Sequence, residues 1–231
     1  MSDGSGDVLV RCAAVTRTFG RGAQAVRAVR DVHATVTIGD RIAVVGRSGS
    51  GKSTLLHLMG GLDTPTTGMV SWPALADRPI DRPGVVGFVF QAPSLLAPLD
   101  VVENVALPLV VAGSANADAH QRALTALAEL GVAELADRLP AELSGGQAQR
   151  VAVARVLAAR PMLVLADEPT AQLDAVQRDL VVDTLLALSR RLGAGLVVST
   201  HDTEVAARFT VRWHMRDGQL DGSTPNRKAS A

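Results

Sequence analysis

Short apolar runs alternate along the chain with longer segments whose apolar residues recur at the spacing of helical turns. The short runs are rich in β-branched residues and predict strands. They cover residues 8–15, 32–36, 41–45, 68–72, 85–90, 162–166, 196–200 and 211–215. The helical spacing predicts helices over residues 52–59, 117–130, 146–159 and 175–192. Strands that alternate with helices favour an α/β fold, in which helices cover both faces of a parallel sheet.

The segment from residue 100 to residue 159 interrupts this alternation, because it contains no strand-like run. Asp100 and Glu103 stand at its start with the spacing of a capping box, with Asp in place of the usual Ser or Thr. We therefore predict a helical subdomain over about residues 92–159, inserted in a core made of residues 8–91 and 160–220. The polar residues 1–7 and 221–231 are expected to be flexible ends of this single domain.

The composition fits a globular domain with a sizeable core, since 47% of the 231 residues are hydrophobic and 20% are charged. The formal net charge is zero, which excludes a long-range attraction to nucleic acid or to anionic lipid. Cys12 is the only cysteine, so an intramolecular disulfide and a Cys-based zinc cluster are excluded. Residues 1–7 lack the features of a signal peptide, and the longest uncharged stretch, residues 83–99, contains three prolines and is not a membrane helix. We expect a cytoplasmic protein whose partner supplies any membrane contact.

The segment after the apolar run 41–45 has the sequence and the context of a phosphate-binding loop, because it matches G-x-x-x-x-G-K-[ST] between a strand and a helix. Its residues are Gly46, Arg47, Ser48, Gly49, Ser50, Gly51, Lys52, Ser53 and Thr54. Glycines let backbone N–H groups turn inward around an anion, and the helix that follows adds the positive end of its dipole. We predict that Lys52 holds the β- and γ-phosphates of a nucleotide and that Ser53 binds Mg²⁺. The alternative is a Gly- and Ser-rich turn without a ligand.

Polar residues follow two further buried strands. Asp167 and Glu168 come directly after the run 162–166, where two acids are costly unless a partner neutralises them. We expect Asp167 to reach the Mg²⁺ and Glu168 to polarise the water that attacks the γ-phosphate. His201 follows the run 196–200, at the edge where open parallel sheets place their ligands, and is expected to contact the γ-phosphate and orient Glu168. The alternatives are a helix cap for the acids and a structural role for the histidine.

A second glycine-containing motif lies about ninety residues further along the chain. Residues 143–147 read Leu-Ser-Gly-Gly-Gln, so Ser144, Gly145 and Gly146 are expected to form a second anion-binding nest at the start of a predicted helix, with Gln147 as the next residue of the motif. Together with the Gln-Arg pair at 149–150 and the Ala-Arg pair at 154–155, this motif resembles the signature of the ABC transporter ATPases. The resemblance covers roughly residues 8–220.

The resemblance implies a fold, two ligands and a set of roles. The fold is a P-loop NTPase core, a RecA-like parallel sheet with helices on both faces, with an N-terminal antiparallel β part and an inserted α-helical subdomain. The ligands are ATP and Mg²⁺, and the signature of one chain would close over the phosphate loop of a second copy. Gln91 matches the glutamine that contacts Mg²⁺ and the attacking water. Asp174 matches the D-loop residue at the dimer interface, and Phe19 stands where an aromatic residue stacks on adenine.

Three further segments, residues 60–68, 86–91 and 95–109, resemble the ATPases of the macrolide-exporter and lipoprotein-releasing group. That likeness implies an ATP-hydrolysing subunit, peripheral on the inner face of the cell membrane, that drives a separate permease in export or extrusion. The permease would dock near Gln91 and the helical subdomain, and no nucleic acid partner is expected.

Some positions depart from the pattern of the family. Gln172 stands where a smaller or Asn-like residue is usual, Asp40 replaces Glu, and Val156 replaces Ala in the signature helix. Trp213 and His214 lie in a stretch that is normally apolar and acidic, and edge-strand packing is the simplest interpretation. These departures remove no group that carries chemistry.

Other functions stay open. An ATP-dependent regulatory or mechanotransmission ATPase of the cell-division type fits the same motifs. A soluble ABC ATPase of DNA repair or of the ribosome is less favoured, because the sequence shows no second ATPase domain, coiled-coil arm or zinc-binding insertion. A kinase-like phosphotransferase would leave the motif at 143–147 without a purpose. Since cargo contacts would lie in the permease, the cargo is left open.

Overall fold

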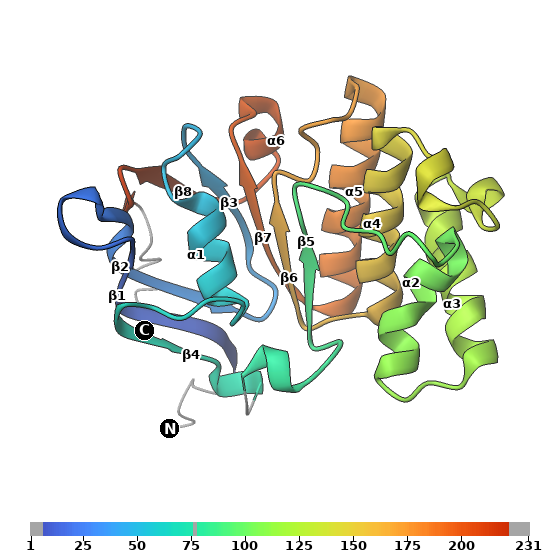
Figure 1. The fold of residues 1–231 in the computed structure, drawn as a ribbon, viewed down its shortest axis with the longest axis horizontal. Helices are drawn as coiled ribbons and strands as arrows, with labels where there is room; N and C mark the ends of the chain where they lie inside the picture. The colour runs from blue at the N-terminus through green and yellow to red at the C-terminus, as the bar shows by residue number, and fades with distance from the viewer. Residues whose placement is uncertain (1–6, 76–77, 222–231) are drawn as a thin grey trace, which may run out of the picture.

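The computed structural model describes residues 7–75 and 78–221 of the chain. Within these residues the strands form a six-stranded sheet and a three-stranded sheet. Figure 1 shows helices around the larger sheet. It also shows α2 (Val101–Val111) and α3 (Asn116–Glu129) at the opposite end of the molecule from β1 (Val8–Phe19) and β2 (Val26–Thr37). The mixed α/β fold predicted from the sequence is confirmed.

The six-stranded sheet has the strand order β5-β6-β7-β3-β8-β9. Its strands are β3 (Arg41–Val45), β5 (Val86–Val89), β6 (Leu163–Asp167), β7 (Gly195–Thr200), β8 (Val211–Arg216) and β9 (Gln219–Asp221). Neighbouring strands are parallel except for β9, which pairs with β8 in the antiparallel sense. The carboxyl ends of β3, β6 and β7 therefore meet at one edge of the sheet, which is where a parallel sheet binds its ligands.

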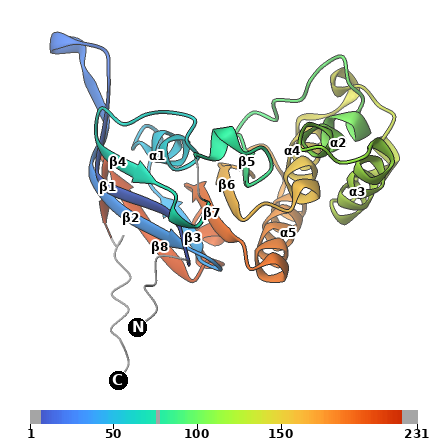
Figure 2. The same ribbon diagram turned by 90° about the horizontal axis from the view of Figure 1, so that it is seen from below.

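The two faces of this sheet belong to two separate apolar clusters, because successive side chains of a strand point to opposite faces. Ala43 packs in the cluster built by α4 (Gly145–Ala159), by α5 (Ala175–Leu192) and by α6 (Thr203–Ala207). Ile42 and Val44 pack in the other cluster, with α1 (Lys52–Met59) and the smaller sheet. Figure 2 shows α1 and α5 on opposite sides of the sheet.

The smaller sheet is antiparallel throughout and has the order β2-β1-β4. Its strands are β1 (Val8–Phe19), β2 (Val26–Thr37) and β4 (Thr67–Ser71). The tip of the β1–β2 hairpin extends beyond the rest of the molecule in Figure 2. This sheet is the antiparallel β part that the sequence predicts.

Three helices, α2 (Val101–Val111), α3 (Asn116–Glu129) and α4 (Gly145–Ala159), form the helical part. Asp100 caps α2 as predicted: its carboxylate accepts from the N–H of Glu103 at 2.8 Å, and the Glu103 carboxylate accepts from the N–H of Asp100 at 3.0 Å. Short 3₁₀ turns lie at Gly22–Gln24, Pro73–Leu75, Pro79–Asp81, Ala133–Leu135 and Pro140–Glu142. The exact limits of a helical subdomain stay a prediction.

The structure differs from the predictions at several places. Strand β2 begins at Val26, earlier than the predicted 32–36, because its first half carries charged residues beyond the core and lacks an apolar run. Strand β9 and the short helix α6 were not predicted, and Asp221, expected in a flexible end, closes β9. The other residues of the predicted flexible ends, apart from Asp7, lie outside the described residues. Trp213 is fully buried in β8, which is covered by β9 and is not the edge strand.

Val156, one of the departures from the family pattern, fits against a glycine of β5. A Cβ atom at Gly87 would lie 2.4 Å from Cγ1 of Val156 and 3.0 Å from Cγ of Pro161. The valine therefore occupies space that a side chain at residue 87 would need.

Replacement of Gly87 by Ala is expected to lower the free energy of unfolding by about 1–3 kcal/mol, because the new methyl group overpacks the contact with Val156. The double variant Gly87→Ala/Val156→Ala should lose less stability than the sum of the two single variants. Urea unfolding of the four proteins of this cycle measures the difference. Strictly additive losses would contradict the packing described here.

Candidate functional site

The loop of residues 46–54 connects β3 to α1 and leaves no room for side chains at two of its glycines. A Cβ at Gly46 would lie 2.3 Å from the carbonyl oxygen of Met215, and a Cβ at Gly51 would lie 2.1 Å from that of Ala28. Gly51 also has a φ of 105°, which L-residues with side chains rarely adopt. The loop thus packs closely against β2 and β8 and leads directly into the start of α1, and a glycine-rich loop before a helix N-terminus is an arrangement that binds phosphate.

Lys52 lies across this loop. Its ammonium group donates to the carbonyl oxygens of Gly46 at 2.9 Å and of Arg47 at 3.2 Å. The same nitrogen lies 3.3 Å from Oε1 of Glu168, and the lysine side chain is 5% exposed. A nearly buried cation is therefore held at the centre of the loop, next to the carboxylate that follows β6.

The residues at the carboxyl ends of β6 and β7 are joined by hydrogen bonds. The Ser199 hydroxyl donates to the carboxylate of Asp167, the last residue of β6. It also accepts from the backbone N–H of Glu168 at 3.0 Å. Glu168 has a φ of 46°, a left-handed conformation that is uncommon for this residue type and is typical of functional sites. The turn after β6 is therefore fixed by β7.

Glu168 and His201 contact each other directly. Nδ1 of His201 lies 2.9 Å from Oε2 of Glu168, while Oε1 of the same carboxylate faces Lys52. The Glu168 side chain is 11% exposed and that of His201 is 66% exposed. The structure thus brings together Lys52, Glu168 and His201, three residues that follow three different strands in the sequence.

A cavity of about 540 Å³ opens over these groups. It is lined by Ala28, Arg47, Ser48, Gly49, Gly51, Lys52, Ser53, Thr54, Gln91, Glu168 and His201. All of these except Ala28 were predicted as site residues. A cavity of this size suits a small organic ligand, and the loop N–H groups and Lys52 favour an anionic one.

The cavity also offers oxygen donors of the kind that bind Mg²⁺. Ser53 and Gln91 line the cavity, and Asp167 lies buried beneath it with its carboxylate bonded to Ser199. Mg²⁺ is usually bound by one or two protein oxygens together with phosphate oxygens and water, so this donor set fits the ion. Among residues 7–75 and 78–221, no cluster of three His, Cys, Asp or Glu side chains forms an all-protein metal site.

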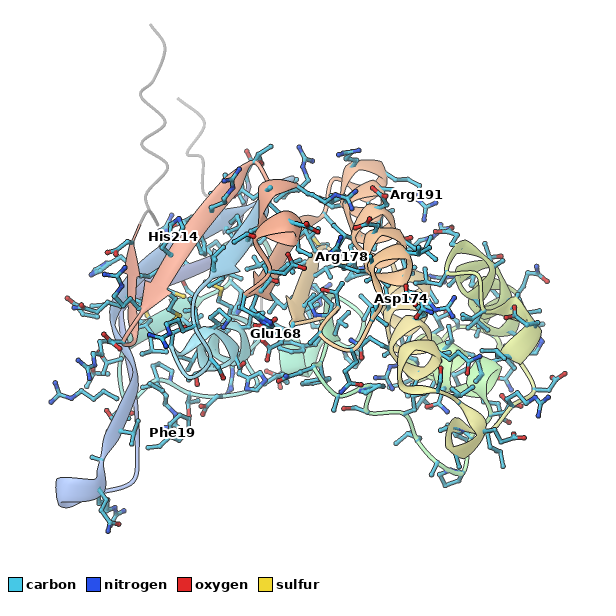
Figure 3. All side chains as sticks on the ribbon, turned by 90° about the horizontal axis from the view of Figure 1, so that it is seen from above. Phe19, Glu168, Asp174, Arg178, Arg191 and His214 are labelled. Atoms are coloured by element: carbon cyan, nitrogen blue, oxygen red, sulfur yellow. The ribbon has the colours of Figure 1, made fainter. Side chains whose placement is uncertain are left out.

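Several predicted residues do not line this cavity. Residues 144–147 of the second motif lie at the start of α4, where Ser144 caps the helix and accepts from the N–H of Gln147 at 3.3 Å. Asp174 caps α5 by accepting from the N–H of Gln177 at 2.9 Å. Figure 3 shows Asp174 on α5 and Phe19 far out on the β1–β2 hairpin, on the other side of Glu168. The start of α4, which the sequence predicts to be a second anion-binding nest, therefore does not line the cavity over the loop of residues 46–54.

The ABC transporter family model matches residues 29–171, well over half of the chain. The chain belongs to the ABC transporter family. Two curated relatives, the lipoprotein-releasing system ATP-binding proteins LolD of Legionella pneumophila strains Paris and Lens, are each 39% identical over 221 residues. These alignments cover 93% of this chain and 97% of each relative.

Solved structures agree with this assignment. The ATP-binding cassette MJ0796, a dimer in a post-hydrolysis state bound to ADP and Pi, has a TM-score of 0.85 and 35% identity, covering 92% of this chain and 97% of that one. CbiO1 from Clostridium perfringens, part of the transporter complex cbiONQ, has a TM-score of 0.77 and 25% identity, covering 93% and 87%. This ABC protein is an ATP-binding, ATP-hydrolysing subunit. No helix of its described residues is long and apolar enough to cross a membrane.

Three residues near the site of this ABC ATPase were missed in the sequence. Ser199 joins the ends of β6 and β7, and Ala28 lines the cavity. Arg17 packs its guanidinium 4.5 Å from the centre of the Phe19 ring and binds Asp63 at 2.8 Å. The bonds of Ser199 to Asp167 and Glu168 and the bond of Arg17 to Asp63 link residues more than thirty positions apart, so no local motif could predict them.

Proposed function

We propose that two copies of this ATPase pair head to tail, bind two MgATP between them, and drive a separate membrane permease. One observation supports the proposal: residues 144–147 at the start of α4 do not line the cavity formed by the loop of residues 46–54 in the same chain. A nest at the start of α4 can contribute to a phosphate site only if another copy brings its own loop to it. The MJ0796 structures to which this chain is similar are dimeric.

Lys52 and the N–H groups of the loop would hold the β- and γ-phosphates. Mg²⁺ would be held by Ser53, Asp167 and Gln91, and would supply charge neutralisation for the phosphate oxygens. Ser144, Gly145, Gly146 and Gln147 of the opposing copy would complete the phosphate site, with Asp174 at the interface. Phe19, 44% exposed and backed by Arg17, presents one open face on which adenine would stack.

Glu168 would act as the general base in the hydrolysis of ATP. It accepts the proton of the attacking water while the new bond to the γ-phosphorus forms and the bond to ADP breaks. Lys52 lies at one carboxylate oxygen and His201 at the other, so the base is held at a fixed place in the cavity. His201 would contact the γ-phosphate and orient Glu168, and preorganised cations such as Lys52 stabilise the negative charge of the transition state.

The permease would dock near Gln91 and the helical part, which places the ATPase on the inner face of the cell membrane. Exposed apolar side chains support such a contact, and Leu96 is exposed in the segment between Gln91 and α2. Since the chain is similar to the lipoprotein-releasing LolD proteins, we infer that it serves export or extrusion rather than import.

Co-purification tests the proposal. Tagged Glu168→Gln protein, expressed in the native host and recovered from membranes solubilised with MgATP, should bring down a permease with few membrane helices and a large external domain. Leu96→Glu should abolish the capture. Met69→Glu is the matched control, because Met69 is equally an exposed apolar residue but lies on β4, and it should leave the capture unchanged.

Two results would contradict the transport proposal. Recovery from the soluble fraction alone, with nucleic acid or ribosomal proteins, would replace the membrane role by a soluble one. Capture of a membrane protein of the cell-division machinery would support mechanical work in place of export.

A further inference from the structure

A cluster of charged side chains joins the first turn of α5 to the segment that follows His201. Nη1 of Arg178 lies 3.3 Å from Oδ2 of Asp202, and Nη2 lies 2.8 Å from Oε2 of Glu204. Nε of Arg178 lies 3.2 Å from Oδ1 of Asp179. One guanidinium therefore contacts three carboxylates, two of which belong to the segment directly after His201.

The backbone on both sides of this contact is well fixed. On α5, the N–H of Arg178 donates at 2.8 Å to the carbonyl of Asp174, the residue that caps the helix. On the other side, the Asp202 carboxylate caps α6 by accepting from the N–H groups of Glu204 at 2.8 Å and Val205 at 3.3 Å. Arg178 thus connects two helix starts, one at Asp174 and one next to His201, and Figure 3 shows Asp174 and Arg178 along α5.

Both partners of the central pair are charged at neutral pH. Partial desolvation raises the pKa of Asp202, but the backbone N–H donors of Glu204 and Val205 and the charge of Arg178 outweigh it and hold the pKa below its ordinary value. The hydrogen bond to Asp179 and the neighbouring carboxylates raise the pKa of Arg178. Without Arg178, the carboxylates of Asp202 and Glu204 would repel the carboxylate of Asp179 on α5.

The side chain of His201 has little support of its own. It is 66% exposed, and the hydrogen bond that the structure gives it is the one to Glu168. The position of its ring therefore depends on the backbone on which it stands, and Asp202 is the next residue of that backbone.

We propose that Arg178 is a positioning residue for His201, which holds the His201 segment against the helix that begins at Asp174. The inference rests on the proposed function, since it takes His201 as the contact to the γ-phosphate and Asp174 as part of the dimer interface. Arg178 would then connect the interface between the two copies to the group that orients Glu168.

Steady-state ATP hydrolysis of the full chain tests this role. Arg178→Met is expected to lower kcat about fivefold, because a small displacement of a catalytic group costs rate, while KM for ATP stays within about twofold. Arg178→Lys should restore part of the rate, since an ammonium group can pair with Asp202 but cannot contact three carboxylates at once. A loss of stability alone would not explain a kcat that returns in part with lysine while KM stays nearly constant in both variants.

A matched control comes from the same cluster. Arg208 binds Asp179 and Asp183 on α5, and its described contacts do not include Asp202 or Glu204. Arg208→Met removes a similar surface charge and a similar ion pair, yet it should leave kcat unchanged. Thermal unfolding of both variants accounts for any shared effect on stability.

A double-mutant cycle isolates the pair. Asp202→Asn removes the charge but keeps a good helix cap, because the amide oxygen accepts the same N–H bonds. It should lower kcat as Arg178→Met does, and the double variant should be no slower than the slower of the two single variants.

Three outcomes would overturn the positioning role: an unchanged kcat in Arg178→Met, a loss equal to that of Arg208→Met, or fully additive losses in the cycle. Each of these leaves ATP hydrolysis by the unmodified protein intact. A failure of the proposed function itself would show differently, as a chain whose unmodified form does not hydrolyse ATP.

Discussion

Replacement of Glu168 by Gln is expected to lower the rate of ATP hydrolysis by about 10²-fold or more, while ATP still binds. The amide has nearly the shape of the carboxylate and can still contact Lys52 and His201, which lie 3.3 Å and 2.9 Å from the two oxygens. It cannot accept the proton of the attacking water at neutral pH. The variant should therefore hold ATP in the site without consuming it.

The measurement pairs two readouts. Phosphate release under saturating MgATP gives the rate, and calorimetry gives the affinity for ATP. Glu134→Gln is a suitable control, because Glu134 is an exposed carboxylate on a 3₁₀ turn away from the cavity and its loss should change neither quantity. Rapid ATP hydrolysis by the Glu168→Gln variant would contradict the assignment of Glu168 as the general base.

If the head-to-tail pairing is right, the same variant should also dimerise when ATP is added, because the closed pair is no longer opened by hydrolysis. Light scattering after gel filtration with and without MgATP measures this. The expectation follows from the proposed pairing, in which the start of α4 of each copy would complete the cavity of the other, since residues 144–147 do not line the cavity of their own chain.

Local sequence patterns predict most of the large sheet, because β3, β5, β6, β7 and β8 each contain a short run rich in apolar residues, and only the short polar strand β9 lacks one. The loop of residues 46–54 is equally local, since its glycines, its lysine and the start of α1 follow one another along the chain. The strand ends that hold Glu168 and His201 follow from topology: parallel strands place their carboxyl ends at one edge. The large sheet, the loop and the two strand ends can therefore be predicted from the sequence alone.

What the sequence could not predict are contacts made between elements. The hydroxyl of Ser199 looks like any serine in a buried strand, yet it fixes the turn that carries Glu168. Arg178 looks like a solvent-exposed helix residue, yet it meets the segment after His201. The need for glycine at residue 87 becomes clear only when α4 packs on β5 and brings Val156 next to it. In each case the partner is set by packing, and no spacing along the chain encodes it.

Lys52→Ala is expected to weaken the binding of ATP by about 10- to 100-fold, because a charge-assisted bond to the phosphates is worth about 1.5–3 kcal/mol. The change also leaves the Glu168 carboxylate, now 3.3 Å from the ammonium nitrogen, without its cationic neighbour. That carboxylate would then face the phosphates unscreened, which weakens binding further.

Lys52→Met separates charge from shape, since methionine fills much of the lysine volume in this 5% exposed position but carries no charge. If the charge holds the phosphates, the Met variant should lose affinity as the Ala variant does, and calorimetric titration with ATP measures both. Unchanged thermal unfolding would show that the loop is still folded, although Lys52 no longer bonds the carbonyl oxygens of Gly46 and Arg47. Binding that survives in Lys52→Met but not in Lys52→Ala would mean that the lysine supports the loop by packing, and the phosphates would then be held by the backbone N–H groups and the start of α1 alone.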